Sequence, residues 1–477
     1  MPFNSSLYLV FLVGAVAIFW LLPPGARRMF VLVASLAFYA TWGIVFVWLP
    51  LLVATLVFFC GKRIQADVVR AKSWAWLGIG CLLALLAIFK YRGFLFANLP
   101  FFTRAIPAHT ASLAASIAFP MGISFYTFEA IGYLIDVRQG RVKMPGFLNL
   151  CLFFLFWPNI LSGPILRARE LVPQLSLRKL FEPRFLFEGF DRVIWGLVQK
   201  TVIANVVGIW VDRGFSPTAG GIPPTLDGWF LAIAFGLQIY FDFAGYTNMA
   251  IGTARLLGIT LPENFRHPYH AATPPDFWAR WHMTLSRWIR DYLFFPINAK
   301  WHGAPMPLYL SLLCVMALVG LWHGAGWNFI LWGTLHGAYL VLYRIYESWK
   351  NARLNWGEPR VIAVLWRIGT LLAVLVAWVV FRSADLNRAW EILSAMFYRF
   401  GSGSRFAVGC YAYAALLVLF CAVEPFLMRK LGEIEEHSGD EGLSAFRVLG
   451  RPIAYLFGLL LFLLFDANNA QFIYSQF

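Results

Sequence analysis

Long apolar runs dominate this chain and constrain its fold more than any other feature. A helix of about 20 mostly apolar residues crosses the hydrocarbon core of a bilayer and satisfies its backbone polar groups internally. The runs begin near Ser6, Met29, Ile44, Trp74, Ser112, Phe147, Arg192, Gly228, Leu308, Trp327, Val361, Phe406 and Pro452. The sequence therefore predicts one all-α, polytopic integral membrane domain over residues 1–477, with about 11–13 transmembrane helices, some of them re-entrant or interfacial.

The composition excludes a soluble protein. Hydrophobic residues make up 60% of the 477 and charged residues only 13%, against about 25% charged in ordinary soluble domains. The first run, residues 6–22, has no basic region before it and no small-residue cleavage site after it. We therefore expect a retained first helix rather than a cleaved signal peptide.

The charge pattern indicates which loops face the cytoplasm. The formal net charge is +15, and Lys and Arg gather between apolar runs at residues 62–72, 167–192 and 255–300. The positive-inside rule places these segments in the cytoplasm. A basic surplus can also mean nucleic-acid binding, but the chain has no soluble basic domain, so no nucleic-acid partner is expected. The mixed-charge stretch 429–451 is predicted to be a solvated loop.

The six cysteines lie singly within or at the ends of apolar runs. They show neither a CxxC motif nor a Cys/His spacing typical of zinc ligands. We therefore predict neither a disulfide framework nor a bound metal.

The longest polar and aromatic block runs from Asn264 to Asp291. Thr273 before Pro274 predicts a helix N-cap, and a single helix is expected from there to Asp291. On such a helix His282 lies on the apolar face, whereas Arg280, Arg287 and Asp291 share the opposite face, with Arg290 beside them. The arginines fit either a plain interfacial anchor or a site for donor phosphates.

A second block, residues 320–328, closes one apolar run and opens the next. His323 lies within it, and an ionisable residue at membrane depth is a functional candidate. Gly324 and Gly326 allow the helix to break there, so that a ligand could approach the imidazole. On one ideal helix His323 and His336 would face nearly opposite ways, so a shared metal site is not expected. His336 alone is interpreted as a packing residue.

These blocks belong to an ordered set of motifs that resembles the membrane-bound O-acyltransferase (MBOAT) superfamily, in its bacterial alginate O-acetylation and D-alanyl transfer branch. The matching stretches are 119–128, 135–137, 162–165, 238–246, 248–252, 262–265, 277–282, 290–292 and 320–324. Ala244, Asn248 and Glu129 depart from the residues expected at their positions. The first two put a polar contact in doubt.

The resemblance implies a curved helical shell around a thinned centre with a tunnel, an acyltransferase core at 119–340 and C-terminal helices at 361–477. It implies that His323 is the catalytic base and His282 the second motif histidine. A neutral imidazole suits removal of a hydroxyl proton near pH 7. Residues expected to line the tunnel or orient the histidines are Trp281, Trp322, Asp291 and Asn264, and the candidates for donor binding are Arg280, Arg287 and Arg290.

The expected activity is transfer of an acyl group, acetyl by resemblance, from a cytoplasmic donor across the cell inner membrane toward an extracellular polysaccharide. Acetyl-CoA is the expected donor substrate, without a bound cofactor. Besides membrane lipid, the expected partners are an extracytoplasmic acetyltransferase or esterase-like protein and, indirectly, the polysaccharide.

The chain ends in an aromatic peptide, residues 471–477, that also resembles this branch. Tyr474 at its centre is either an interfacial anchor or an acyl relay. In the relay interpretation, the phenol receives the acyl group inside the protein and passes it to the partner outside.

Other functions remain open at this point. D-alanyl or longer-chain acyl transfer to a cell-envelope polymer fits the same motifs. A transporter or an export scaffold without acyl chemistry would also be polytopic, and Asp242 and Glu129 within apolar runs are the hints of ion sites. Soluble-type acyltransferase chemistry is disfavoured because the chain has no Gly-x-Ser-x-Gly elbow.

Overall fold

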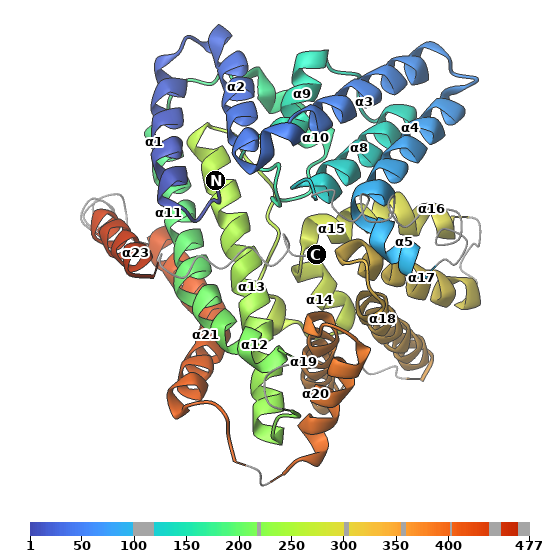
Figure 1. The fold of residues 1–477 in the computed structure, drawn as a ribbon, viewed down its shortest axis with the longest axis vertical. Helices are drawn as coiled ribbons and strands as arrows, with labels where there is room; N and C mark the ends of the chain where they lie inside the picture. The colour runs from blue at the N-terminus through green and yellow to red at the C-terminus, as the bar shows by residue number, and fades with distance from the viewer. Residues whose placement is uncertain are drawn as a thin grey trace. The chain divides into compact units, whose positions relative to one another are not determined.

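The computed structural model describes residues 1–98, 119–216, 221–299, 305–353, 359–400, 403–437 and 450–465. Regular structure in these ranges is entirely helical (Figure 1). Within these described ranges, eight helices are long and apolar enough to cross a membrane, and Ser6–Leu21 and Arg451–Phe465 are shorter apolar helices. The prediction of an all-α, polytopic membrane protein is therefore confirmed.

Contacts between residues divide the chain into two compact units. The first unit comprises Met1–Val193 and Tyr246–Glu263, and the second comprises Ile194–Gly245 and Asn264–Phe477. Helices α11 (Pro183–Leu197) and α13 (Thr225–Leu256) contribute residues to both units.

The first unit carries the N-terminal helices. They are α1 (Ser6–Leu21), α2 (Pro24–Gly43), α3 (Trp48–Ala66), α4 (Ala71–Leu86), α5 (Arg92–Asn98), α8 (Ile123–Arg138), α9 (Phe147–Leu155) and α10 (Ala168–Leu171). Ser5 caps α1 by accepting a hydrogen bond from the Tyr8 amide, and proline at the start of α2 separates it from α1. Helices α3, α4 and α8 pack against one another. Gly78 allows this because a Cβ there would lie 2.7 Å from the Leu134 side chain.

Two departures from the family motif have polar partners in the first unit. Glu129 is buried and accepts hydrogen bonds from Asn159 Nδ2 at 3.0 Å and the Leu166 amide at 2.9 Å. Asn248 accepts a hydrogen bond from Arg192 at 2.5 Å, and Arg192 also pairs with Glu263. Asn248 therefore makes a polar contact of its own in place of the one that the sequence put in doubt.

The second unit contains the remaining helices. They are α12 (Asn205–Phe215), α14 (Pro274–Arg280), α15 (Met283–Ile289), α16 (Phe295–Asn298), α17 (Pro305–His323), α18 (Trp327–Arg353), α19 (Arg360–Arg382), α20 (Leu386–Tyr398), α21 (Val408–His437) and α23 (Arg451–Phe465). The stretch 429–437 is helical, as the end of α21, so the prediction of a loop beginning at Arg429 is wrong. Residues 438–449 of that predicted loop lie outside the described residues.

Helices α17 and α18 form a close hairpin (Figure 1). Gly320 and Gly333 permit the approach because a Cβ on Gly320 would collide with the Phe329 carbonyl and one on Gly333 with the Met316 carbonyl. Small residues at such a contact let two backbones pack directly together. The hairpin fixes the positions of the two halves of the second sequence block.

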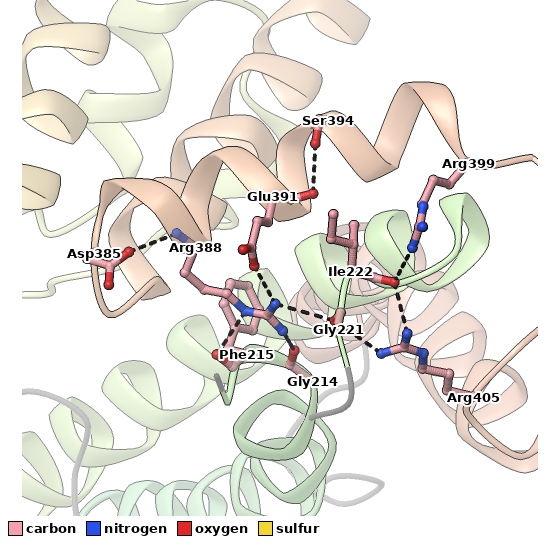
Figure 2. A network of polar contacts seen from close by, with 10 residues as sticks. All are labelled: Gly214, Phe215, Gly221, Ile222, Asp385, Arg388, Glu391, Ser394, Arg399 and Arg405. Atoms are coloured by element: carbon pink, nitrogen blue, oxygen red, sulfur yellow. Dashed lines mark hydrogen bonds and ion pairs between the residues drawn. The ribbon is translucent and has the colours of Figure 1, made fainter. Parts of the chain in front are cut away.

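Arginines hold the segment between α12 and α13 through its main-chain carbonyls (Figure 2). Arg388 of α20 is buried and donates to the Gly214 carbonyl at 2.9 Å and to Glu391 at 2.8 Å. Arg399 and Arg405 both donate to the Ile222 carbonyl, at 2.8 and 2.9 Å. This network ties α20 and the residues between α20 and α21 to the end of α12 and to the segment that precedes α13.

Candidate active site

The segment 264–294 is broken at its centre rather than continuous. Thr273 caps α14 as predicted, accepting a hydrogen bond from the Asp276 amide. The helix ends at Arg280, Trp281 is extended, and His282 has a left-handed backbone with φ of 41° before α15 begins. The predicted single helix from Thr273 to Asp291 is therefore wrong, and side-chain positions cannot be taken from one helical wheel.

The break arises because another segment takes the hydrogen bonds that a continuous helix would use. The Met283 amide donates to the Asn264 carbonyl at 2.9 Å, and the Arg280 carbonyl accepts from the Arg266 amide at 3.0 Å. In an uninterrupted helix these groups would pair four residues along the same chain. Residues 264–266 thus run beside the break and stabilise it.

His282 lies at this break and is fully buried. Its Nδ1 is 3.0 Å from Asn264 Oδ1, and its ring meets Phe243 edge-on with ring centroids 4.7 Å apart. Burial lowers the pKa of His282 to about 3, so its imidazole is neutral at physiological pH. His282 lies outside the eight candidate membrane spans.

His323 is the last residue of α17, at the predicted break. The chain leaves helical geometry at Gly324–Gly326 and resumes at Trp327 in α18. A Cβ on Gly324 would collide with the Phe329 ring, so glycine is needed there for space. The His323 side chain is buried, with ring centroids 4.8 Å from Trp322 and 5.6 Å from Phe381.

Trp322 connects the two motif histidines. Its ring centroid lies 4.8 Å from that of His323 and 6.3 Å from that of His282, which comes from a distant part of the chain. The structure therefore brings His282, Asn264, Trp322 and His323 close together. All four are buried.

Sequence reasoning missed the role of Trp332. Its indole contacts both His323 and His336, with ring centroids 5.0 and 4.9 Å apart, and it stacks on Trp378 at 5.8 Å. Because the chain reverses between α17 and α18, two histidines that would diverge on one helix meet the same indole. His336 also packs on Phe277, in agreement with its interpretation as a packing residue. Trp332 gave no signal because lipid-facing tryptophans look the same in sequence.

Trp281 packs against the same tryptophan, Trp378, that stacks on Trp332. It is buried and lies parallel to Phe277 at 5.7 Å, with Trp378 at 5.0 Å on another side. Its position beside His282 agrees with an orienting or lining role.

The candidate donor-binding arginines are partly engaged within the segment. Arg280 donates from Nε to Asp276 at 2.7 Å, and Arg290 donates to Asp291 at 2.8 Å while remaining about half exposed. Arg287 donates from Nε to the Met283 carbonyl at 3.4 Å. Asp291, a candidate for the tunnel lining, thus pairs with Arg290. Tyr474 and the terminal peptide lie outside the described residues.

The two carboxylates that hinted at a transporter have internal partners. Asp242 forms an ion pair with Lys200, and both side chains are buried. The Glu129 carboxylate accepts hydrogen bonds from the Asn159 side-chain amide and the Leu166 backbone amide. These carboxylates are therefore accounted for by internal hydrogen bonds and charge pairing. Among the described residues, no group of three or more His, Cys, Asp and Glu side chains could hold a metal ion.

Comparison with known proteins shows which family this chain belongs to. Residues 110–368 match the sequence model of the membrane-bound O-acyltransferase family. A probable alginate O-acetylase of Azotobacter vinelandii is 37% identical over 402 residues, covering 83% of this chain and 78% of the relative. A peptidoglycan O-acetyltransferase of Helicobacter pylori is 33% identical, covering 77% and 73%. A teichoic acid D-alanyltransferase of Bacillus subtilis is 30% identical, covering 58% and 70%. This chain therefore belongs to the membrane-bound O-acyltransferase family and is a multi-pass membrane acyltransferase.

Proposed function

We propose that the protein transfers an acetyl group from a cytoplasmic thioester, acetyl-CoA, toward O-acetylation of an extracellular polysaccharide, with His323 as the base. The observation that carries this proposal is the burial of His323 and His282 against the shared ring of Trp322. Relatives of comparable length are named alginate O-acetylase and peptidoglycan O-acetyltransferase, which favours acetyl as the acyl group and a glycan as the acceptor.

In the proposed reaction His323 takes the proton of the attacking hydroxyl. The hydroxyl oxygen forms a bond with the acyl carbon, the carbon–sulfur bond breaks, and the leaving thiolate receives the proton from the imidazolium. General base catalysis of this kind contributes about 10²–10⁴-fold. The aromatic layer of Trp322, Trp332 and Phe381 around His323 supports the proposal because exclusion of water limits hydrolysis of the thioester.

Donor entry from the cytoplasm is supported by the basic character of residues 255–300 and the positive-inside rule. Arg290 is the most exposed of the ion-paired arginines in this block, and Arg280 and Arg287 lie nearby in sequence. Guanidinium groups bind phosphate oxygens in a bidentate manner, as recognition of a nucleotide thioester requires. The cell inner membrane is the location that combines such a donor with an extracellular acceptor.

The proposed partner is an extracytoplasmic acetyltransferase or esterase-like protein that completes delivery to the polymer. Tyr474 is a candidate relay, since a phenolic ester is activated toward onward transfer. D-alanyl transfer is the alternative activity, favoured by the resemblance to teichoic acid D-alanyltransferases.

The test uses the full chain in lipid nanodiscs with acetyl-CoA and its D-alanyl-thioester counterpart, alongside mass spectrometry of polymer from a deletion strain. We expect acetyl transfer by the wild type and at least a 100-fold loss in His323→Ala, as expected for removal of a general base. His437→Ala, at the end of α21, controls for loss of a histidine. Wild-type rates in folded His323→Ala would exclude His323 as the base. A preference for the D-alanyl thioester would show that the transferred group is D-alanyl and not acetyl.

A further inference from the structure

Asn264 contacts several polar groups at the break between α14 and α15. Its Oδ1 lies 3.0 Å from His282 Nδ1, 2.9 Å from Thr284 Oγ1 and 3.3 Å from the Thr284 amide nitrogen. Its carbonyl accepts from the Met283 amide at 2.9 Å. Asn264 therefore caps the first turn of α15 from a separate segment, in the way that an N-cap residue usually does from within the chain.

These contacts fix which way the Asn264 amide points. A backbone N–H can only donate, so the atom that faces the Thr284 amide must be the side-chain oxygen. The reverse orientation would place the Asn264 NH₂ group against that N–H. The same oxygen faces His282 Nδ1.

The amide orientation in turn fixes the tautomer of His282. An amide oxygen can only accept, so Nδ1 must carry the proton and donate it. In the neutral ring this leaves the lone pair on Nε2. Nε2 is therefore a hydrogen-bond acceptor and not a donor.

The Nε2 atom is buried and has no hydrogen-bond partner among the described residues. Two aromatic rings flank His282, Phe243 at 4.7 Å and Trp322 at 6.3 Å between centroids. A buried acceptor without a partner is costly, and so is the left-handed backbone that His282 adopts. Both costs fall on one residue, which shares the Trp322 ring with His323, and this indicates a function for that lone pair.

We propose that Asn264 is a positioning residue that holds His282 as the neutral Nδ1–H tautomer, so that Nε2 accepts a hydrogen bond from an N–H or O–H group of a bound substrate. This inference rests on the proposed function, whose substrates carry such groups. They are the secondary amides in the thiol arm of acetyl-CoA and, where a sugar reaches the site directly, those of its hydroxyls that are not being acylated. The reacting hydroxyl gives its proton to His323, so the two histidines have separate partners.

The low basicity of His282 agrees with this division. Burial lowers its pKa to about 3, which keeps the ring neutral at pH 7 and makes it a poor proton acceptor. A neutral ring with a fixed lone pair binds a donor group without removing its proton. His282 thus orients a substrate rather than serving as a second base.

The tautomer is measured directly on the full chain, uniformly labelled with ¹⁵N-histidine in lipid bilayers, by solid-state NMR. The chain has 8 histidines, so the His282 signals are assigned by difference from His282→Gln. We expect a protonated Nδ1 and an unprotonated Nε2 in the wild type. Thr284→Val retains the amide donor to Asn264 and should keep this pattern, whereas Asn264→Ala should produce a mixture of tautomers. A protonated Nε2 in the wild type, or an unchanged pattern in Asn264→Ala, would overturn the proposal.

Two substrate probes then identify the source of the donor group. A non-hydrolysable thioether analogue of acetyl-CoA should move the His282 Nε2 signal if the thiol arm supplies the N–H. An alginate oligosaccharide should move it if a sugar hydroxyl does. Movement with neither probe would refute the acceptor role. The tautomer measurement needs no turnover, so its outcome is independent of whether acetyl transfer is the correct reaction.

Asn264→Asp separates tautomer control from simple helix capping. Aspartate caps helices as well as asparagine and still accepts from Nδ1, but its charge stabilises an imidazolium. We expect Asn264→Asp to fold normally, to keep the Nδ1–H tautomer, and to raise by at least one unit the pH at which the His282 Nε2 signal becomes protonated in the NMR spectrum. If Asn264 capped α15 without controlling Nδ1, the pH at which His282 becomes protonated would stay unchanged.

Discussion

The imidazole of His323 meets the indole of Trp332 edge-on, with ring centroids 5.0 Å apart and an interplanar angle of 88°. The two residues come from different helices, α17 and α18, and Trp332 is fully buried. The proposed base is therefore oriented by a ring that the chain supplies only after it reverses direction.

Trp332→Ala should lower the stability of the protein and increase the fraction of acetyl-CoA that is hydrolysed instead of being used for acyl transfer. Loss of a buried indole costs about 3–5 kcal/mol in unfolding free energy, and water admitted beside His323 should divert the thioester to hydrolysis. The measurement is the ratio of acetyl-CoA hydrolysis to acyl transfer, together with the thermal midpoint in detergent. Trp390→Ala removes a tryptophan that is 71% exposed and should leave both nearly unchanged. An unchanged ratio in Trp332→Ala would mean that Trp332 does not exclude water from the site.

Gly333→Ala should destabilise the α17–α18 hairpin. The added Cβ would collide with the Met316 carbonyl, so the helices must separate and His323 must move. We expect a lower thermal midpoint and reduced transfer. Gly369→Ala in α19 is the matched control, because nothing lies within 4 Å of a Cβ there. In a helix that change should stabilise by about 0.5–1 kcal/mol, and equal destabilisation of both variants would contradict the packing argument.

Arg280→Glu should raise the KM for acetyl-CoA if the guanidinium contacts the donor phosphates. The substitution also breaks the pair with Asp276, whose oxygen lies 2.7 Å from Nε. Asp276→Asn weakens that pair but leaves the positive charge of Arg280. It therefore separates the effect of losing the ion pair from the effect of losing a charge that binds phosphate. We expect KM to rise in Arg280→Glu and Arg287→Glu and not in Asp276→Asn. Similar kinetics in Arg280→Glu and Asp276→Asn would reduce Arg280 to a helix-stabilising residue.

His282 should make the protein less stable as the pH falls. The pKa of His282 is about 3 in the folded protein, whereas an unfolded histidine has a pKa of about 6.5. Between these values the unfolded chain binds more protons than the folded protein. The free energy of unfolding therefore falls by up to about 1.4 kcal/mol for each pH unit as the pH drops below about 6.5. His282→Gln removes this term, and its thermal midpoint should fall less than that of the wild type between pH 7.5 and 5. Parallel curves would show that burial does not lower the pKa of His282 in the folded protein.

Tyr474→Phe should decide between relay and anchor. The substitution keeps the aromatic ring and removes only the hydroxyl that an acyl relay needs. If Tyr474 is a relay, acetylation of the polymer stops while donor hydrolysis by the membrane protein continues, and intact-mass analysis of the wild type shows an acetyl adduct on the terminal peptide. Normal polymer acetylation by Tyr474→Phe would make Tyr474 an interfacial anchor.

The sequence determined the class of fold and the family. Apolar runs long enough to span a bilayer require helices, because only internal hydrogen bonds satisfy a backbone in lipid. Gly324 and Gly326 correctly indicated the break after His323, and Thr273 correctly indicated the start of α14. These features depend on local chemistry, which sequence records directly.

Tertiary structure alone decided what surrounds the histidines. A continuous helix through His282 satisfies every local rule, yet Asn264 and Arg266 take its backbone partners and force His282 into a left-handed conformation. Trp332 reaches His323 only because Gly320 and Gly333 allow two helices to touch. Such contacts arise between segments far apart in the chain, and their energies depend on positions that no local pattern of residues encodes.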